Sequence, residues 1–398
     1  MSLSPKTKAI LICGSVILSI SLGIRHSFGL FLQPISLELG WGREVFGLAI
    51  AIQNLVWGIA QPFAGIQADR RGAAPVILVG GVLFATGVFL MTVAGTALLF
   101  QLAAGVLVGL GLAGTTMPIV FGAISRAMPP EKRSLAFGVA MSIGSIGQFA
   151  LLPSSLFMIN GLGWTTALLI LSLLGSLIVP LSFAIKQNAA AGATVSGPSA
   201  KEAARHALRD RGFLMLCLGF FVCGFQVVFI ATHMPAYLVD AGMSASLGST
   251  VLALIGLFNI FGSLAAGYLG GKFSKPKLLT GIYLGRAVAI SVFIAVPITA
   301  LSASVFAAVM GLLWLSTVPL TNAAVATMFG VKNMSLLGGI VFLAHQIGSF
   351  LGGWLGGVIF DQLGSYDLAW TFAIALSMVA AAANWPIKDA PVKIVATA

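Results

Sequence analysis

An arginine interrupts the first apolar stretch of the chain. Arg25, in the segment SISLGIRHSFGLF (residues 19–31), lies about 16 residues into the stretch, roughly 24 Å along a helix and too deep to reach the surface. A charge at such depth costs about 2.5–3.5 kcal/mol on insertion scales and usually faces a functional cavity. Because a guanidinium offers a planar fork of donors that fits a carboxylate, the chemistry indicated is binding of a small anion.

The sequence offers no acid at similar depth to neutralise Arg25. Every aspartate and glutamate falls between the apolar stretches or at their ends. At an offset of 201 residues from Arg25 stands Gln226, which is also polar within an apolar stretch. We therefore interpret the missing counter-ion as the substrate, a carboxylate or a similar small anion.

Further polar side chains lie about halfway along other apolar stretches. They are amides and an imidazole, which can hydrogen-bond either a bound molecule or a neighbouring helix. With Arg25 and Gln226, the predicted substrate-binding residues are Gln53, Asn54, Gln148, Asn322, His345 and Gln346. If a proton is carried, a histidine or the substrate carboxyl must take it, because imidazole titrates near neutral pH. The roles of His26 and Arg286 are left open by the sequence.

The composition shows in which medium these residues must be held. Hydrophobic residues make up 59% of the chain, charged residues 8%, and the mean hydropathy is +1.06. A chain of this kind is an integral membrane protein, and its long apolar runs without two-residue alternation predict helices rather than a barrel. Since no nucleophile–base set and no metal-ligand spacing occurs at depth, we expect no enzyme, no metal and no cofactor.

Runs of about 20 apolar residues predict twelve transmembrane helices, so the fold class is an all-α membrane protein. The predicted spans are 9–37, 45–66, 74–94, 97–124, 135–159, 165–185, 213–239, 247–269, 278–297, 303–329, 336–360 and 368–386. Lysines and arginines gather in alternate loops, which predicts that both termini and the middle stretch are cytoplasmic. The net charge of +11 follows from this asymmetry. It indicates attraction to anionic membrane lipids and no nucleic-acid partner.

The chain repeats itself at one offset. TTMPIVFGAISRAM (115–128) aligns with STVPLTNAAVATMF (316–329), and SLAFGVAMSIGSIG (134–147) with SLLGGIVFLAHQIG (335–348), both 201 residues apart. The repeat predicts two parallel six-helix halves with a site between them, which is a transporter architecture. We expect an N-terminal six-helix bundle at 1–186, a cytoplasmic linker at 187–211 that ends in a short amphipathic helix, and a C-terminal six-helix bundle at 212–398.

The loop GIQADRRG (65–72) resembles the signature G-x-x-x-D-[RK]-x-G of the major facilitator superfamily. Its counterpart GYLGGKFSKPK (267–277) has Gly271 in place of the acid. FGLFLQPISLELGW and GIAQPFAGIQADRRG are similar to bacterial members of the monocarboxylate and oxalate/formate porter group. The resemblance implies two pseudo-symmetric bundles that rock to give alternating access, in a bacterial inner membrane. Unlike eukaryotic-type monocarboxylate porters, residues 247–269 hold no charge, so the coupling mechanism stays open.

The same loop supplies the predicted gate. Asp69 can accept N–H groups at a helix N-terminus, and family analogy indicates the span that opens at Ser335. Arg70 and Arg71 can pair with the opposite half or with Glu131. Such contacts would hold the cytoplasmic side shut. The predicted gating residues are Gly65, Asp69, Arg70, Arg71, Gly72 and Glu131.

Three functions remain compatible with the sequence. The favoured one is a secondary active transporter of small organic anions, monocarboxylate-like, with H+ symport as the candidate coupling. The alternatives are an exporter of neutral or amphipathic compounds or drugs, with Arg25 in a structural role, and a non-transporting membrane sensor. Proton-coupled export of cations is disfavoured for two reasons. Such an exporter would use a carboxylate embedded in the membrane, and Gln101 replaces the arginine of the superfamily at the start of the fourth span. We expect a monomer.

Overall fold

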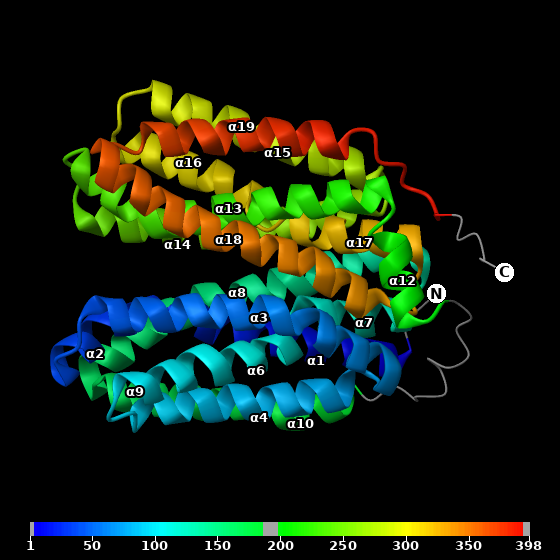
Figure 1. Ribbon diagram of the computed structural model, residues 1–398, viewed down its shortest axis with the longest axis horizontal. Helices are drawn as coiled ribbons and strands as arrows, with labels where there is room; N and C mark the ends of the chain where they lie inside the picture. The colour runs from blue at the N-terminus through cyan, green and yellow to red at the C-terminus, as the bar shows by residue number, and fades with distance from the viewer. Residues whose placement is uncertain (1–3, 186–197, 393–398) are drawn as a thin grey trace. The chain divides into compact units, whose positions relative to one another are not determined.

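A computed structural model describes residues 4–185 and 198–392, and across these ranges the secondary structure is helical, without strands (Figure 1). In the described part of the chain, twelve helices or helix runs are long and apolar enough to cross a membrane. The predicted all-helical fold is confirmed. Residues 187–197 of the predicted linker lie outside the described residues.

The first six candidate spans contain several breaks. Their elements are α1 (Pro5–Ser27), η1 (Phe28–Phe31), α2 (Leu32–Leu39), α3 (Arg43–Arg71), α4 (Ala73–Thr92), α5 (Ala97–Phe100), η2 (Gln101–Leu107), α6 (Val108–Thr115), α7 (Met117–Ala127), α8 (Pro130–Leu162), α9 (Trp164–Ser176) and α10 (Ile178–Ala184). The run from α1 to α2 forms the first span and the run from α5 to α7 the fourth. Both runs contain a non-α segment, η1 being a 3₁₀ helix and η2 a π-helix.

The second half begins with the short amphipathic helix expected at the end of the linker. Its elements are α12 (Ala200–Ala207), α13 (Arg211–Asp240), α14 (Ala245–Gly270), α15 (Lys275–Ala295), α16 (Ala300–Leu313), α17 (Thr317–Phe329), α18 (Met334–Leu363) and α19 (Asp367–Asn384). A capping box starts α12, because Ser199 accepts the Glu202 N–H and donates its own N–H to the Glu202 carboxylate. These hydrogen bonds lower the pKa of Glu202.

Contacts divide the chain into two compact units. Unit 1 comprises Met1–Pro129, Ile143–Gly197 and Val331–Gly339, and unit 2 comprises Pro130–Ser142, Pro198–Gly330 and Ile340–Ala398. The start of α8 therefore groups with unit 2 and the rest of that helix with unit 1. The start of α18 groups with unit 1 and its remainder with unit 2. Each unit thus holds the first turns of a helix that continues in the other.

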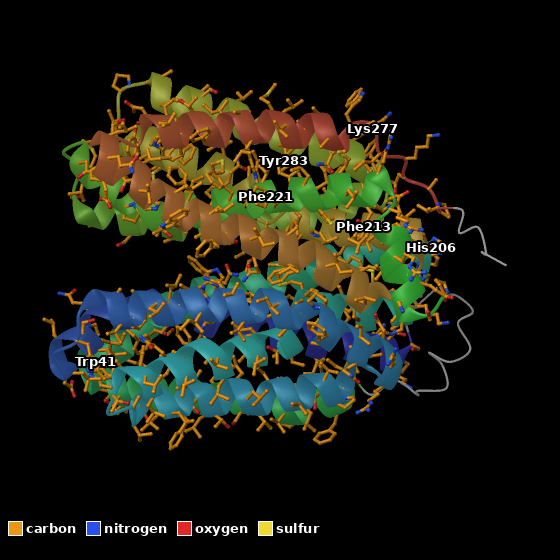
Figure 2. The ribbon with its side chains drawn as sticks, in the orientation of Figure 1. Trp41, His206, Phe213, Phe221, Lys277 and Tyr283 are labelled. Carbon is orange, nitrogen blue, oxygen red and sulfur yellow. The ribbon has the colours of Figure 1, made fainter. Side chains whose placement is uncertain are left out.

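Packing within each unit follows the internal repeat. In unit 1, α4 packs against α9, and in unit 2 the elements 201 residues further on, α15 and α19, pack against each other. The core of unit 2 carries buried polar groups as well as apolar ones. Tyr283 of α15, labelled in Figure 2, is fully buried and donates its hydroxyl to the Gly219 carbonyl of α13. The aromatic ring therefore fills the core while its polar tip is satisfied.

Candidate functional site

Arg25 lies in the last turn of α1 and reaches α3 within unit 1. Its Nη2 donates to Asn54 Oδ1 at 3.1 Å, and its buried Nε has no hydrogen-bond partner among the described residues. Within the described chain no carboxylate forms an ion pair with Arg25. The guanidinium therefore has a neutral partner on one side and an unused donor on the other.

The backbone changes its helical form directly after Arg25. Ser27 Oγ donates back to the Gly23 carbonyl at 2.9 Å, and His26 Nδ1 lies 2.7 Å from the Leu22 carbonyl. Such back-bonding competes with the regular helix, and the span continues as the 3₁₀ segment η1. His26 is exposed and engages the backbone of its own helix. The irregularity sets Arg25 at the end of the regular part of its span.

A second unused donor lies on the helix that packs against α1. Gly23 of α1 meets Gly147 and Leu151 of α8 so closely that a Cβ there would come within 2.7 Å of the Gly147 carbonyl oxygen. Gln148, next to Gly147, is 4% exposed, and its buried Nε2 has no partner among the described residues. Buried donors without partners are rare in proteins and point to a bound molecule or water.

Gln53 and Asn54 are neighbours on α3, yet they serve different partners. Gln53 is buried, and its Nε2 donates to the Ala104 carbonyl of η2 at 2.7 Å. A π-helix withdraws carbonyls from the usual i+4 bond, so this contact supports the fourth span. Asn54 accepts the hydrogen bond from Arg25. The structure thus brings Asn54, and not the Gln53 amide nitrogen, to the arginine.

Gln226 of α13 is fully occupied by protein partners in unit 2. Its Nε2 donates to the Ala373 carbonyl at 2.8 Å and to Ser377 Oγ, both on α19, while its Oε1 accepts from Arg286 Nη1 at 3.1 Å. Because both ends of the amide are used, Gln226 holds helices together.

Arg286 of α15 is the buried cation of unit 2. Its Nε and Nη2 donate to the Leu313 carbonyl at 3.2 and 2.8 Å, and Nη2 also donates to the Trp314 carbonyl. These carbonyls belong to the end of α16, where helix geometry leaves them without an internal partner. The role of Arg286, open from the sequence, is to satisfy this helix end.

His345 and Gln346 lie together on α18. His345 is 8% exposed, and its Nδ1 lies 3.3 Å from both Gln346 Oε1 and Ser349 Oγ. The imidazole stacks on Phe342, with ring centroids 5.5 Å apart. Asn322 of α17 donates to the Val318 carbonyl of its own helix at 2.9 Å. The imidazole is thus positioned by packing and by hydrogen bonds at one ring nitrogen.

Asp69 of α3 caps the start of α18 within unit 1. Its carboxylate oxygens accept the Ser335 N–H at 3.1 Å and the Leu336 N–H at 2.8 Å, and Arg126 Nη1 of α7 pairs with Oδ1 at 2.8 Å. The side chains of Asp69 and Arg126 are 4% and 11% exposed. The contact with Ser335 that the family resemblance predicts is present. Arg126 is not among the gating residues predicted from the sequence.

Two glycines of the loop have a steric role. A Cβ at Gly65 would lie 2.6 Å from the Ser335 carbonyl carbon and 2.7 Å from the Leu336 nitrogen, so only glycine permits this approach of α3 to α18. Gly72 has φ of 89°, which disfavours any other residue at the turn into α4.

The remaining predicted gating residues are Arg70, Arg71 and Glu131. All three are exposed, and within the described residues none forms an ion pair. A pairing of Arg70 or Arg71 with Glu131 would join the two units and stays a prediction. Across 4–185 and 198–392, no group of three or more His, Cys, Asp or Glu side chains could hold a metal ion.

Comparisons with known proteins cover nearly the whole chain. The family model described as Major Facilitator Superfamily matches residues 11–331. The uncharacterized MFS-type transporter YcxA of Bacillus subtilis (strain 168) is 25% identical over 386 residues, covering 92% of each chain. Monocarboxylate transporter 11 of Mus musculus is 27% identical over 376 residues, covering 90% of this chain and 82% of the mouse protein.

A solved structure shares the fold. The proton:xylose symporter XylE, bound to 6-bromo-6-deoxy-D-glucose, superposes with a TM-score of 0.70 at 13% identity, covering 96% of this chain and 94% of that one. At this identity the likeness concerns the fold alone.

Proposed function

Since this chain belongs to the Major Facilitator Superfamily, we propose that it is a secondary active transporter of small organic anions of the monocarboxylate class. The observation that carries the proposal is the environment of Arg25, a cation within a candidate membrane span. Arg25 has an amide partner and an unused donor, and no carboxylate of the described chain forms an ion pair with it. The name of the mouse relative, a monocarboxylate transporter, supports the same substrate class.

A carboxylate substrate would accept hydrogen bonds from donors of unit 1 that have no partner. Desolvating a guanidinium without a counter-ion is costly, and an anion removes that cost when it binds. Asn54 holds one nitrogen of the guanidinium, which fixes the direction of the fork. The unused donor of Arg25 would bind the anion, and the unused donor of Gln148 lies on α8, which touches α1 at Gly23 and Gly147.

We propose Asp69 as the switch of alternating access. Helix α18 starts in unit 1 and continues in unit 2, so independent movement of the units requires its first turn to leave the carboxylate. The contact between the Asp69 carboxylate and the N-terminus of α18 would stabilise one conformation of the transporter, and it can break when another conformation is favoured.

We propose a proton as the coupling ion, carried by His345 or by the substrate carboxyl. His345 is a buried imidazole on α18, the helix whose start Asp69 holds. Imidazole is the side chain that changes charge near neutral pH. Protonation at this place would add a positive charge when the anion is bound and remove it when the anion leaves.

Transport into proteoliposomes tests the proposal. Labelled lactate, pyruvate and formate are offered to wild type and to Arg25→Gln, with and without an inside-alkaline pH gradient, and labelled glycerol serves as the neutral control. We expect uptake of at least one anion by wild type, stimulated by the gradient and lost in Arg25→Gln. Uptake of neutral or amphipathic compounds that is equal in both proteins would instead assign the exporter function.

A further inference from the structure

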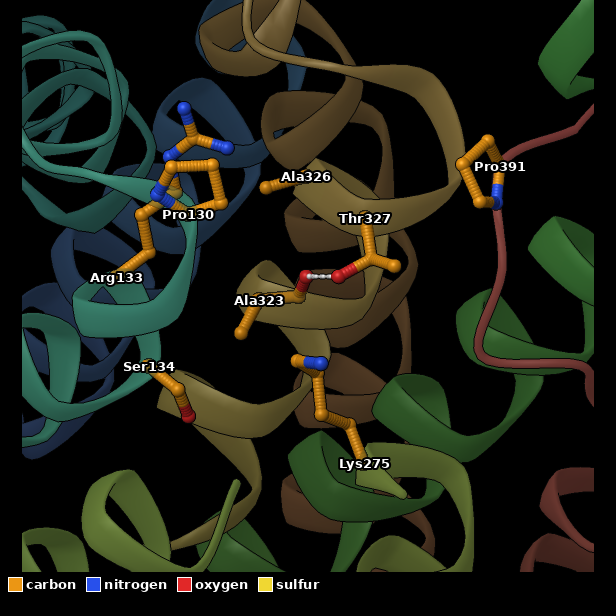
Figure 3. A pocket seen from close by; sticks show the side chains of 8 residues that line it. All are labelled: Pro130, Arg133, Ser134, Lys275, Ala323, Ala326, Thr327 and Pro391. Carbon is orange, nitrogen blue, oxygen red and sulfur yellow. Dashed lines mark hydrogen bonds between the residues drawn. The ribbon is translucent and has the colours of Figure 1, made fainter. Parts of the chain in front are cut away.

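A cavity of about 230 Å³ lies in unit 2, where α8 and α15 begin and α17 ends (Figure 3). Its polar lining consists of Arg133 and Ser134 of α8, Lys275 of α15 and Thr327 of α17. It far exceeds the roughly 30 Å³ that one water molecule occupies in the liquid. Candidate membrane spans start at Pro130 and Lys275 and end at Phe329, so the cavity lies at the depth of a span end.

The internal repeat shows which residues of unit 1 correspond to this region of unit 2. At the offset of 201 residues, Arg126 of unit 1 corresponds to Thr327, and Ser335 corresponds to Ser134. In place of Asp69 stand Gly270 and Gly271 at the end of α14. Both partners of the unit 1 ion pair are therefore replaced by smaller residues in unit 2.

The contacts around Ser134 support this correspondence. Asp69 approaches the backbone of Ser335 in unit 1, and in unit 2 a Cβ at Gly270 would run into Ser134 Oγ. The glycine thus brings α14 against the same turn of α8 without supplying a carboxylate. Thr327, which stands at the position of Arg126, lines the cavity, whereas Gly270 packs directly against Ser134.

One polar side chain of the cavity lining, Ser134, lacks a hydrogen-bond partner among the described residues. Ser134 is 3% exposed, and its Oγ is buried. Lys275 Nζ lies 3.2 Å from Asp389 Oδ2, and the same carboxylate accepts the Lys275 N–H at 3.0 Å. Arg133 adds a second cation to the lining and interacts electrostatically with the neighbouring Glu131. The Thr327 hydroxyl already donates to the Ala323 carbonyl at 3.0 Å, as the dashed line in Figure 3 marks.

We propose that this cavity binds a phosphate-type oxyanion, carried either by a lipid headgroup or by free inorganic phosphate. A guanidinium, an ammonium and an unpaired hydroxyl form a donor set for tetrahedral oxyanions. Asp389 already places an oxyanion on Lys275, and the incoming phosphate shares that cation with it. The span-end depth suits the phosphate of a lipid.

The bound anion would connect the starts of α8 and α15. In unit 1 the Asp69–Arg126 pair links α3, α7 and the start of α18. In unit 2 a phosphate between Arg133, Ser134 and Lys275 would link the start of α8 to α15. In unit 1 the link is an ion pair within the protein, whereas in unit 2 it would be a bound phosphate. This site is separate from Arg25 and does not depend on the transported substrate.

Thermal unfolding of the purified full-length protein tests the site. In a maltoside detergent, sodium phosphate is compared with sodium chloride at equal ionic strength, and phosphatidylglycerol with diacylglycerol of the same acyl chains. We expect wild type to gain Tm with phosphate or phosphatidylglycerol over its partner. A gain with inorganic phosphate identifies the free anion, and a gain with phosphatidylglycerol alone identifies the headgroup. No gain with either would overturn the proposal.

Variants separate the cavity from general charge effects. Ser134→Ala and Arg133→Gln should lose most of the Tm gain, whereas Lys272→Gln, an exposed lysine outside the cavity lining, should keep it. An equal gain in all three variants would contradict the proposal.

A rebuilt ion pair provides a test that does not rely on removing groups. The double variant Gly271→Asp with Thr327→Arg imitates Asp69 and Arg126, and the nearest atom to a Cβ at Gly271 is 3.4 Å away. A variant that folds and no longer responds to phosphate supports the site. A variant that folds and responds as strongly as wild type would refute it.

Discussion

Arg126 Nη1 lies 2.8 Å from Asp69 Oδ1, and the same carboxylate accepts two N–H groups from the first turn of α18. Three elements, α3, α7 and α18, therefore meet at one buried acid. Each of its bonds is charge-assisted, and none is needed to fold α3 itself. A contact of this kind is suited to being broken and remade.

Asp69→Asn should slow transport more than it weakens substrate binding. The amide keeps the size of the side chain but leaves Arg126 without a counter-charge and weakens the cap on α18. We expect turnover to fall about tenfold, which corresponds to roughly 1.4 kcal/mol. Counterflow rates and equilibrium binding on the same preparation measure the two effects.

The matched control is Asp389→Asn, which removes the ion pair that Asp389 forms with Lys275 in the described part of the chain. That pair is more exposed, so its loss should leave turnover within about twofold, as for surface pairs worth about 0–1 kcal/mol. Equal turnover in Asp69→Asn and wild type would reduce Asp69 to an anchor.

The spans and the Asp69 contact could be predicted because both leave a signal in the linear pattern. Twelve apolar runs must be helices in lipid, since every backbone group needs an internal partner. The acid of the signature loop needs a positive partner, and family analogy indicates Ser335. Arg126 was missed because an arginine at a span end also satisfies the charge rule for cytoplasmic loops.

The partners of polar residues within spans could not be predicted, because depth does not reveal which way a side chain points. Gln226 and Arg25 are equivalent by the repeat and alike in depth, yet Gln226 bonds to α19 and to Arg286 while Arg25 has unused donors. The sequence leaves the role of Arg286 open. In the structure Arg286 is fully buried against the end of α16.

Arg286→Met should destabilise the protein without changing substrate affinity. The substitution leaves the Leu313 and Trp314 carbonyls and the Gln226 amide oxygen short of donors. We expect a loss of about 2–4 kcal/mol, because each buried polar group left unsatisfied costs about 1–3 kcal/mol. Thermal unfolding and the substrate Kd of the folded fraction report the two quantities. A weakened Kd at unchanged stability would move Arg286 into the binding site.

His345→Gln should uncouple transport from the pH gradient. Glutamine can keep a hydrogen bond to Ser349 but does not titrate near neutral pH. We expect exchange of anion across the membrane to persist while gradient-driven accumulation is lost. The control is His233→Gln, since His233 is held by the Gly353 carbonyl at 2.9 Å and should not affect coupling. Accumulation that survives in His345→Gln would assign the proton to the substrate carboxyl.

The charge pattern predicts a cytoplasmic α12 and an external loop between α13 and α14. In a chain freed of its three cysteines, Lys201→Cys should react with a membrane-impermeant maleimide only after the cells are opened, and Ser244→Cys should react in intact cells. Both positions are exposed, so failure to react reports the side of the membrane rather than burial. The opposite pattern would invert the orientation.

The substitution of Arg25 tests the substrate class most directly. Arg25→Gln keeps a donor for Asn54 but deletes the charge, whereas Arg25→Lys keeps the charge and loses the fork. If a carboxylate is the partner, Gln should weaken binding by about 2–5 kcal/mol, and Lys should fall between Gln and wild type. The folded protein should be as stable as wild type or more so, because a buried charge without a counter-ion is gone. Thermal unfolding and anion binding on one purified sample separate the roles of Arg25. A destabilised Arg25→Gln protein with wild-type affinity would show that Arg25 is structural, and the organic-anion assignment would then be wrong.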